Sequence, residues 1–291
     1  MRVHFFLSRD EVPDELFPTW NPDLDPQKYS SGLGHNILEL ASRLKIMGHE
    51  VSLGSNVPRR TEIVIFFKKH FLLQRKLSFV VFKIALKYPV ILIRSDLPVE
   101  NQLVFEPDLE VMPNRLMARN SNQIFIPPIP QRGLKARDTN RQTKAFNLAI
   151  KCNPENIPNS LNFIVEQLKV IDPKFSLVID SPTIADGSDN NWNDFSQVDI
   201  SLIIRPETSV SSDRKPPTRL INAWVAGTIP FADPLPAYLE LIKDGVDGFI
   251  VRKPEDVAVI AKVLLDNPEY RAEVFANAKK RGEDFSVEKV L

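Results

Sequence analysis

Short apolar runs alternate with amphipathic stretches along most of the chain. The first half holds four such runs, each typical of a buried parallel strand: 3–7, 50–53, 62–67 and 90–94. Residues 72–86 place their apolar side chains at helical spacing, as does the segment that precedes residue 50. The alternation predicts βαβ units, and therefore a parallel sheet covered by helices.

The same alternation resumes in the second half of the chain. Apolar runs predict strands at 145–150, 175–179, 198–204, 229–232 and 248–251. Apolar residues at helical spacing predict helices at 160–170, 217–226, 235–243, 257–265 and 270–280. We therefore expect an α/β protein with two Rossmann-like parallel-sheet domains, residues 1–130 and 141–291.

One segment between these halves has no period. It reads QIFIPPIPQRGLKARD (123–138), and its prolines and glycine favour irregular loop structure. We interpret residues 131–140 as a hinge between the two domains. We expect the two domains to face each other across a cleft, beside the carboxyl ends of their strands, where ligands of these folds bind.

Composition narrows the class of protein. The chain is 43% hydrophobic and has a formal net charge of zero, so no global field attracts nucleic acid. Cys152 is the single cysteine, which excludes an internal disulfide and favours a reducing compartment such as the cytoplasm. The N-terminal apolar run is too short for a signal peptide, and charges interrupt every longer apolar stretch. No His/Cys cluster has metal-ligand spacing, so we expect no metal site.

One predicted helix begins with basic and polar residues although the rest of it is apolar. The segment is KPPTRLINAWVAGTIPF (215–231). The backbone N–H groups at a helix start have no partner within the helix, and the helix dipole adds positive charge there, so the start favours an anion. The two prolines lack an N–H, so Thr218 and Arg219 must supply the donors. We interpret this helix start as an anion site that also includes Lys215.

Charged residues also follow two predicted strands directly. Arg205 ends the run VDISLIIRP, which places it at the carboxyl edge of the second sheet and adds a cation to the anion site. Arg94 and Asp96 lie at the end of the strand at 90–94, where Asp96 could orient an acceptor hydroxyl. Loop carboxylates more commonly cap helices or face water, and the basic residues have a plain alternative as surface charges.

Three stretches resemble GT-B glycosyltransferases, and within them the retaining glycosyltransferase family four. SGLGHNILELASRLKIMGHEVSL (31–53) resembles the glycine loop and helix that open the acceptor domain. The helix at 215–231, with its Ala-Gly-x-x-Pro exit, resembles the donor-domain helix. PAYLELIKDGVDGFIV (236–251) resembles the segment that follows it in the family, in the same order and spacing.

The resemblance implies an enzyme that moves a sugar from a nucleotide-sugar to an acceptor hydroxyl, without a metal and without an organic cofactor. Cations and N–H groups stabilise the diphosphate that leaves. The acceptor, bound by the first domain, would be a glycan, a small molecule or a lipid-linked compound. The residues implied are Arg205, Lys215 and Asp96 for catalysis, Arg219, Asn222, Thr218, Glu240, Gly32 and Gly34 for the donor, and His35 and Arg94 beside the acceptor.

The chain departs from the family pattern at one important pair of positions. The family carries two glutamates with seven residues between them, and these positions hold Arg214 and Asn222 here. An amide can still hydrogen-bond a ribose hydroxyl. The departure leaves a second interpretation open, a catalytically inactive GT-B-like binding or partner subunit. A third and weaker interpretation is a sugar-nucleotide epimerase or a phosphorylase of the same fold.

Other candidates have ordinary alternatives. Gly32 and Gly34 equally fit a plain tight turn, and His35 fits a helix cap or a surface position. Residues 59–87 hold eight basic side chains against Glu62 alone, interleaved with phenylalanines. This pattern favours a solvated helix face over a phenylalanine core. The alternative is peripheral contact with the inner face of a membrane, which would suit a lipid-linked acceptor.

Overall fold

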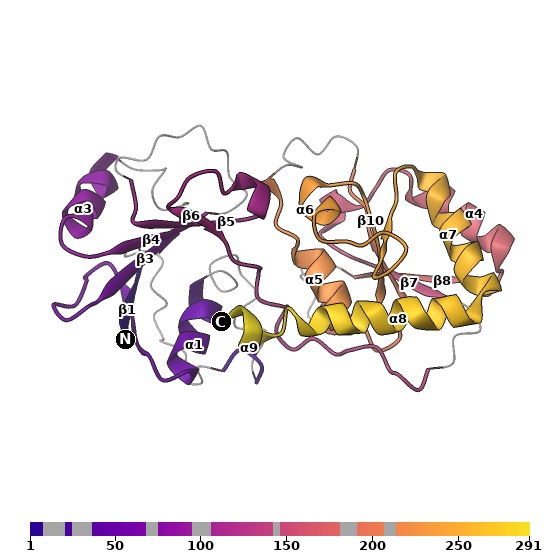
Figure 1. Ribbon diagram of the computed structural model, residues 1–291, viewed down its shortest axis with the longest axis horizontal. Helices are drawn as coiled ribbons and strands as arrows, with labels where there is room; N and C mark the ends of the chain where they lie inside the picture. Colours follow the sequence, from indigo (N-terminus) through magenta and orange to yellow (C-terminus); the bar gives the residue numbers. More distant parts are fainter. Residues whose placement is uncertain are drawn as a thin grey trace. The chain divides into compact units, whose positions relative to one another are not determined.

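The chain forms two compact units, Met1–Ile126 and Pro127–Leu291. A computed structural model describes residues 1–7, 21–24, 37–67, 75–94, 106–141, 146–180, 191–206 and 214–291. Each unit contains one parallel β-sheet (Figure 1). The predicted α/β class, with two parallel sheets in sequence, is confirmed.

The sheet of the first unit has six strands in the order β2-β1-β3-β4-β5-β6. Its strands are β1 (Arg2–Phe6), β2 (Glu50–Gly54), β3 (Ile63–Phe67), β4 (Val90–Ile93), β5 (Leu109–Met112) and β6 (Gln123–Phe125). The accompanying helices are α1 (Glu39–Ile46), α3 (Arg75–Ala85) and the 3-10 turn η4 (Arg115–Met117). Alternate residues of β1 enter different cores: Val3 and Phe5 pack with α1, whereas Phe6 packs with α3. The sheet is therefore buried on both faces, as its continuous apolar strands require.

Two strands of this sheet, β5 and β6, were not expected from the sequence. The run Leu-Glu-Val-Met of β5 has a charge at its second position, so it lacks a continuous apolar signal. Glu110 is nevertheless buried, because the guanidinium of Arg94 pairs with it at 2.7 Å. β6 falls at the beginning of the segment that we interpreted as irregular, and it has only three residues.

The sheet of the second unit has five parallel strands in the order β11-β10-β9-β7-β8. Its strands are β7 (Asn147–Lys151), β8 (Ser176–Asp180), β9 (Ile200–Ile203), β10 (Ile229–Ala232) and β11 (Phe249–Ile250). Its helices are α4 (Leu161–Ile171), α5 (Thr218–Val225), α6 (Pro236–Leu239), α7 (Pro254–Asp266), α8 (Pro268–Glu283) and α9 (Val287–Val290), with 3-10 turns η5 (Pro154–Asn156) and η6 (Asn191–Asn193). Helices α4 and α7 pack on one face of the sheet, and α5 and α6 pack on the other.

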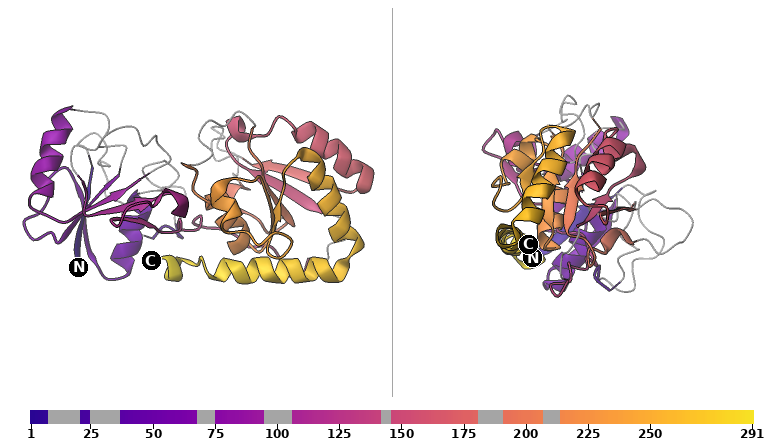
Figure 2. Two further views of the ribbon diagram at one scale, coloured as in Figure 1. Left: turned by 45° about the horizontal axis from the view of Figure 1, so that its top comes forward. Right: turned by 90° about the vertical axis from the view of Figure 1, so that its right-hand side faces the viewer.

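Helix α8 runs alongside α5 (Figure 2). The two helices approach most closely at Gly282, where an added Cβ would lie 2.3 Å from the carbonyl oxygen of Trp224. The Trp224 indole is fully buried, donates to the Asp247 carbonyl oxygen at 2.7 Å and stacks on Phe285. The glycine therefore permits a backbone contact that fixes the position of α5.

Residues 131–138, which make up most of the predicted hinge at 131–140, belong to the second unit and form hydrogen bonds within it. Lys135 N donates to Asn193 O at 2.9 Å, and Arg137 N donates to Ala226 O at 2.8 Å. The side chain of Gln131 also meets that of Asn222. The described units divide after Ile126. A hinge at 131–140 stays a prediction.

Among the described residues, no helix has both the length and the apolar character needed to cross a membrane. Within the basic segment 59–87, α3 buries Val81 and Ile84 in the first unit, whereas Val80 and Phe82 are exposed. Contact of this segment with a membrane surface stays a prediction.

Candidate functional site

The candidate site lies at the carboxyl edge of the second sheet, where β9 and β10 end side by side. Ile203 pairs with Ala232 in the strand register, so the residues that follow the two strands are neighbours. The backbone N–H of Arg205 donates to Asp233 Oδ2 at 3.1 Å. This hydrogen bond holds one cation and one carboxylate together at the strand ends.

Helix α5 begins at the same edge, because it connects the carboxyl end of β9 to the amino end of β10. Its N-cap is Pro217, and Thr218 and Arg219 form its first turn. Lys215 lies half-buried just before it. The structure thus brings Arg205 and Arg219 to one place, as the sequence predicted. Burial, and after it the nearby charge of Arg205, lowers the pKa of Arg219.

Four buried polar atoms in this region have no hydrogen-bond partner among the described residues. They are Arg205 Nε, Arg219 Nη1, Asp233 Oδ1 and Tyr238 OH. We call these four residues the unpartnered cluster. Buried polar atoms in folded proteins almost always find a partner, and leaving one unpaired costs about 1–3 kcal/mol. Four of the seven such atoms found among the described residues lie at this one strand edge.

Burial dominates the electrostatics of this cluster. It raises the pKa of Asp233 to about 6, although the Arg205 charge, the hydrogen bond from Arg205 N and the Arg219 charge oppose the shift. Burial also raises the pKa of the Tyr238 phenol and lowers that of Arg219. Two guanidiniums face a single carboxylate that is partly protonated near neutral pH, so the cluster carries excess positive charge.

Comparison with solved structures places this geometry in a known fold. The chain superposes on a sucrose-phosphate synthase from Thermosynechococcus elongatus with a TM-score of 0.60 and 9% identity, over 99% of this chain and 96% of that one. Superposition on a glycosyltransferase from Rickettsia africae gives a TM-score of 0.59 and 10% identity, over 99% of this chain and 95% of that one. Superposition on Anabaena HepE in complex with UDP-glucose gives a TM-score of 0.55 and 10% identity, over 100% of this chain and 97% of that one. The chain has the GT-B fold.

These likenesses concern the fold, since the identities are near 10%. No protein-family model matches the sequence, and no curated protein matches it. Membership of glycosyltransferase family four stays a prediction. In the terms of the GT-B fold, the unpartnered cluster lies in the second of the two Rossmann-like domains.

Asn222 lies on the buried side of α5, where it pairs with another amide. Its Oδ1 accepts from Gln131 N at 2.9 Å, and its Nδ2 donates to Gln131 Oε1 at 3.1 Å. Asn222 and Arg219 line one small cavity of about 30 Å³ together with Gln131 and Lys151, which is room for about one water molecule. Both polar atoms of the amide thus have protein partners, and the predicted ribose contact would require this pair to open.

Of the other predicted donor residues, Thr218 lies in the first turn of α5 and Glu240 follows α6, whereas the two glycines lie outside the described residues. Glu240 is exposed at the C-cap of α6. Gly32 and Gly34 lie outside the described residues, and their role in donor binding stays a prediction.

Of the acceptor-side candidates, only Arg94 lies among the described residues. Its guanidinium makes two 2.7 Å bonds to Glu110, whose Oε2 also accepts from Gln123 Nε2 at 2.9 Å. This buried ion pair links the end of β4 to β5 and β6, and the role of Arg94 beside the acceptor stays a prediction. Asp96 and His35 lie outside the described residues, so their assigned roles stay predictions.

Sequence analysis did not single out Asp233 and Tyr238. Asp233 carries the same signal that identified Arg205, because it is the first charged residue after a continuous apolar strand. Tyr238 has no such signal, since it is one aromatic residue in a short helix with several apolar neighbours. No group of three or more potential metal ligands occurs in the described part of the chain.

Proposed function

We propose that the protein is a glycosyltransferase that moves a sugar from a nucleotide-sugar donor to an acceptor hydroxyl, with retention of configuration and without a metal ion. The unpartnered cluster beside the start of α5 carries this proposal. Breaking the bond between the sugar and the nucleotide leaves negative charge on a diphosphate oxygen, and donors that are already in place stabilise that charge most effectively.

The residues at hand suit this task. Arg205 Nε and Arg219 Nη1 are buried N–H groups that a diphosphate oxygen can satisfy. Lys215 and the backbone N–H groups in the first turn of α5 add positive charge at the same end. Two of the similar structures support the proposal, because they contain nucleotide-sugars. HepE is solved with UDP-glucose. An α1,3-fucosyltransferase, which superposes with a TM-score of 0.50, is solved with GDP-fucose.

Metal independence rests on the same charges. Three basic side chains around the α5 start can supply the positive charge that a divalent cation supplies elsewhere. Retention rests on the sequence resemblance to family four. The acceptor, whether glycan, small molecule or lipid-linked compound, would bind the first domain.

Nucleotide binding by the intact protein tests the proposal. We expect calorimetry to detect binding of UDP, GDP or ADP. The double variant Arg205→Ala/Lys215→Ala should lower the affinity for that nucleotide at least 10-fold. The affinity for the matching nucleoside should fall less than twofold in the same variant, because the nucleoside lacks the diphosphate. Lys174→Ala, which removes an exposed lysine before β8, serves as the matched control and should change neither affinity. Equal losses for nucleotide and nucleoside would contradict the assigned roles.

A second candidate function is a binding or partner subunit without catalysis. Arg214 and Asn222 favour it, because they stand where the family carries carboxylates and the Asn222 amide is already paired with Gln131. Release of free sugar from the sugar conjugate of the nucleotide that binds would favour the enzyme. Failure of UDP, GDP and ADP to bind at millimolar concentration would favour the subunit.

A further inference from the structure

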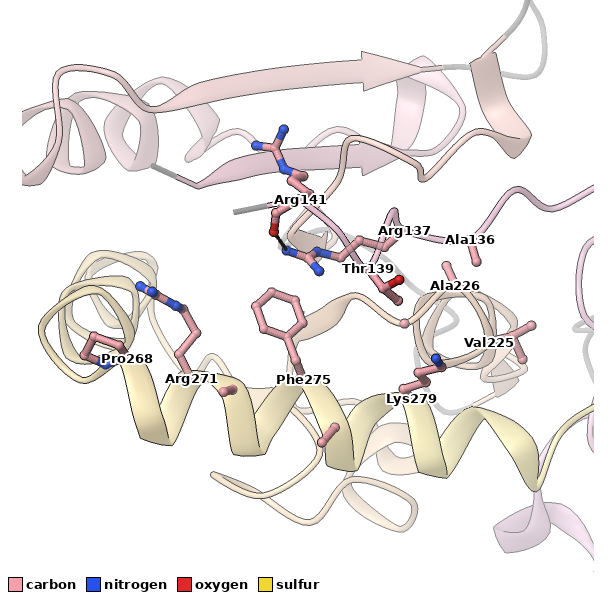
Figure 3. A pocket seen from close by; sticks show the side chains of 13 residues that line it. Ala136, Arg137, Thr139, Arg141, Val225, Ala226, Pro268, Arg271, Phe275 and Lys279 are labelled. Atoms are coloured by element: carbon pink, nitrogen blue, oxygen red, sulfur yellow. Dashed lines mark hydrogen bonds between the residues drawn. The ribbon is translucent and has the colours of Figure 1, made fainter. Parts of the chain in front are cut away.

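A second pocket lies in the same unit, at the edge formed by the amino ends of the strands. Figure 3 shows the side chains that line it. Its volume is about 420 Å³. Its walls are the end of α5 at Val225, the segment from Ala136 to Arg141 and one face of α8. Asp199, which anchors this region, precedes β9 whereas Arg205 follows it, so the two edges are about 20 Å apart at the rise of a β-strand.

The charged residues that line this pocket are all cations. They are Arg137, Arg141, Arg271 and Lys279, which we call the basic pocket. Asp199 is fully buried behind it and already receives bonds from Arg137 at 2.8 Å and Arg141 at 3.1 Å. One carboxylate therefore faces two guanidiniums, and the pocket keeps a strong positive excess.

Two of the four cations are not neutralised. Arg271 donates one hydrogen bond, to the Leu264 carbonyl oxygen at 3.2 Å, and has no carboxylate partner among the described residues. Lys279 likewise has no ion-pair partner in the described part of the chain. The two residues lie eight positions apart on α8, about 12 Å along the helix axis, and both side chains turn toward the pocket (Figure 3).

The space between these two cations is apolar. Phe275 stands midway on the same face of α8 and stacks against the Arg137 guanidinium, whose carbon lies 4.2 Å from the ring centroid. The neighbouring Ala272 and Ala276 are small, and Gly227 lines the opposite wall without a side chain. Flat guanidinium and phenyl surfaces accept a flat ring by stacking.

We propose that the basic pocket is a second ligand site, for a small molecule that carries a phosphate group and a flat ring. Arg271 binds the phosphate, and the ring lies along the apolar space beside Phe275, toward Lys279. The site is independent of the donor site, since it shares no residue with the unpartnered cluster and lies at the other ends of the strands. It does not depend on the proposed transferase function.

Pyridoxal 5′-phosphate is a suitable probe for the intact protein, because it combines a flat ring, a phosphate and an aldehyde. The aldehyde condenses with a lysine amine to an imine with loss of water, and borohydride reduces the imine to a stable amine. Peptide mass spectrometry then measures the labelling of each lysine. Lys280 is the internal control, since it is exposed on the same helix but lies about 100° around it.

We expect saturable labelling of Lys279 at least fivefold faster than that of Lys280. Inorganic pyrophosphate should suppress it, and Arg271→Ala should lower it to the rate of Lys280. Lys215→Ala should leave labelling of Lys279 unchanged, which separates this site from the donor site. Equal labelling of Lys279 and Lys280, or no protection by pyrophosphate, would overturn the proposal. The pyrophosphate arm needs no variant and so holds even if Arg271→Ala folds poorly.

Discussion

Asp233 shows how a single buried carboxylate can link the candidate site to stability. Its Oδ2 accepts the Arg205 N–H at 3.1 Å, while its Oδ1 is buried without a partner. Burial outweighs the attraction of Arg205 and Arg219 and raises its pKa to about 6. The folded protein therefore ionises this group only at a cost, which a ligand with matching donors would remove.

The cost of ionising Asp233 gives a pH-dependent prediction. Its folded pKa lies above the ordinary value of 3.8, so its contribution to stability is complete below pH 3.8 and is lost as the pH rises through 6. A shift of about two units corresponds to about 3 kcal/mol. We expect Asp233→Asn to stabilise the protein by about 2–3 kcal/mol at pH 7.5, and by almost nothing at pH 4.

Urea unfolding of Asp233→Asn and of the parent protein at both pH values measures this difference. Asp266→Asn is the control, because Asp266 makes an exposed ion pair with Lys262 that contributes little. A stabilisation that is the same at pH 4 and pH 7.5 would contradict the titration of Asp233.

At the scale of elements, the apolar pattern predicted most of the sheet and the polar signals predicted part of the site. Strands such as β3 and β9 are confirmed. They were predictable because a short continuous apolar run in an α/β chain is typical of a buried strand. β5 was missed because its buried Glu110 depends on Arg94, which is 16 residues away in the sequence. A tertiary ion pair of this kind leaves no periodic signal.

The candidate site was predictable to a similar extent. Arg205 and Arg219 were identified from their places after a strand and at a helix start, and the structure brings them together. Tyr238 lies near these two arginines because of the way α6 packs on the sheet, and the local sequence does not encode this packing. The Asn222–Gln131 pair joins residues 91 positions apart, so it too required the structure.

The crossing of α5 and α8 gives a prediction at this scale. A Cβ at position 282 would lie 2.3 Å from the Trp224 carbonyl oxygen, so Gly282→Ala must push the two helices apart. We expect it to lower the free energy of unfolding by about 1–3 kcal/mol, although alanine in a helix is otherwise preferred to glycine.

Thermal and urea unfolding measure this effect of Gly282→Ala. Glu283→Ala, at an exposed position next to it, should change stability by less than about 0.5 kcal/mol. Stabilisation by Gly282→Ala would show that α8 does not need the close contact.

At the scale of the whole molecule, the second unit has what a domain needs to fold. Three hydrophobic clusters lie within its described residues, including the fully buried Leu148, Trp224 and Phe231. Its sheet is covered by helices on both faces, and all four residues of the unpartnered cluster belong to it. Both folding and donor binding should therefore reside in this one unit.

We expect the fragment Pro127–Leu291 to fold alone and to bind the preferred nucleotide within threefold of the full chain. Its thermal transition should be cooperative, and the Arg205→Ala/Lys215→Ala change should weaken nucleotide binding in the fragment as it does in the full chain. A folded fragment with no nucleotide affinity would place essential donor contacts in Met1–Ile126.

The reciprocal amide pair of Gln131 and Asn222 also constrains how this chain can change over evolutionary time. Glutamate at position 222 would set a carboxylate against the Gln131 Oε1 atom, which now accepts a bond from Asn222. Descendants that acquire an acidic side chain at position 222 should therefore exchange Gln131 for a donor or a small residue. The two positions would drift together as a correlated pair, and a sequence that changes one without the other would carry a repulsive contact.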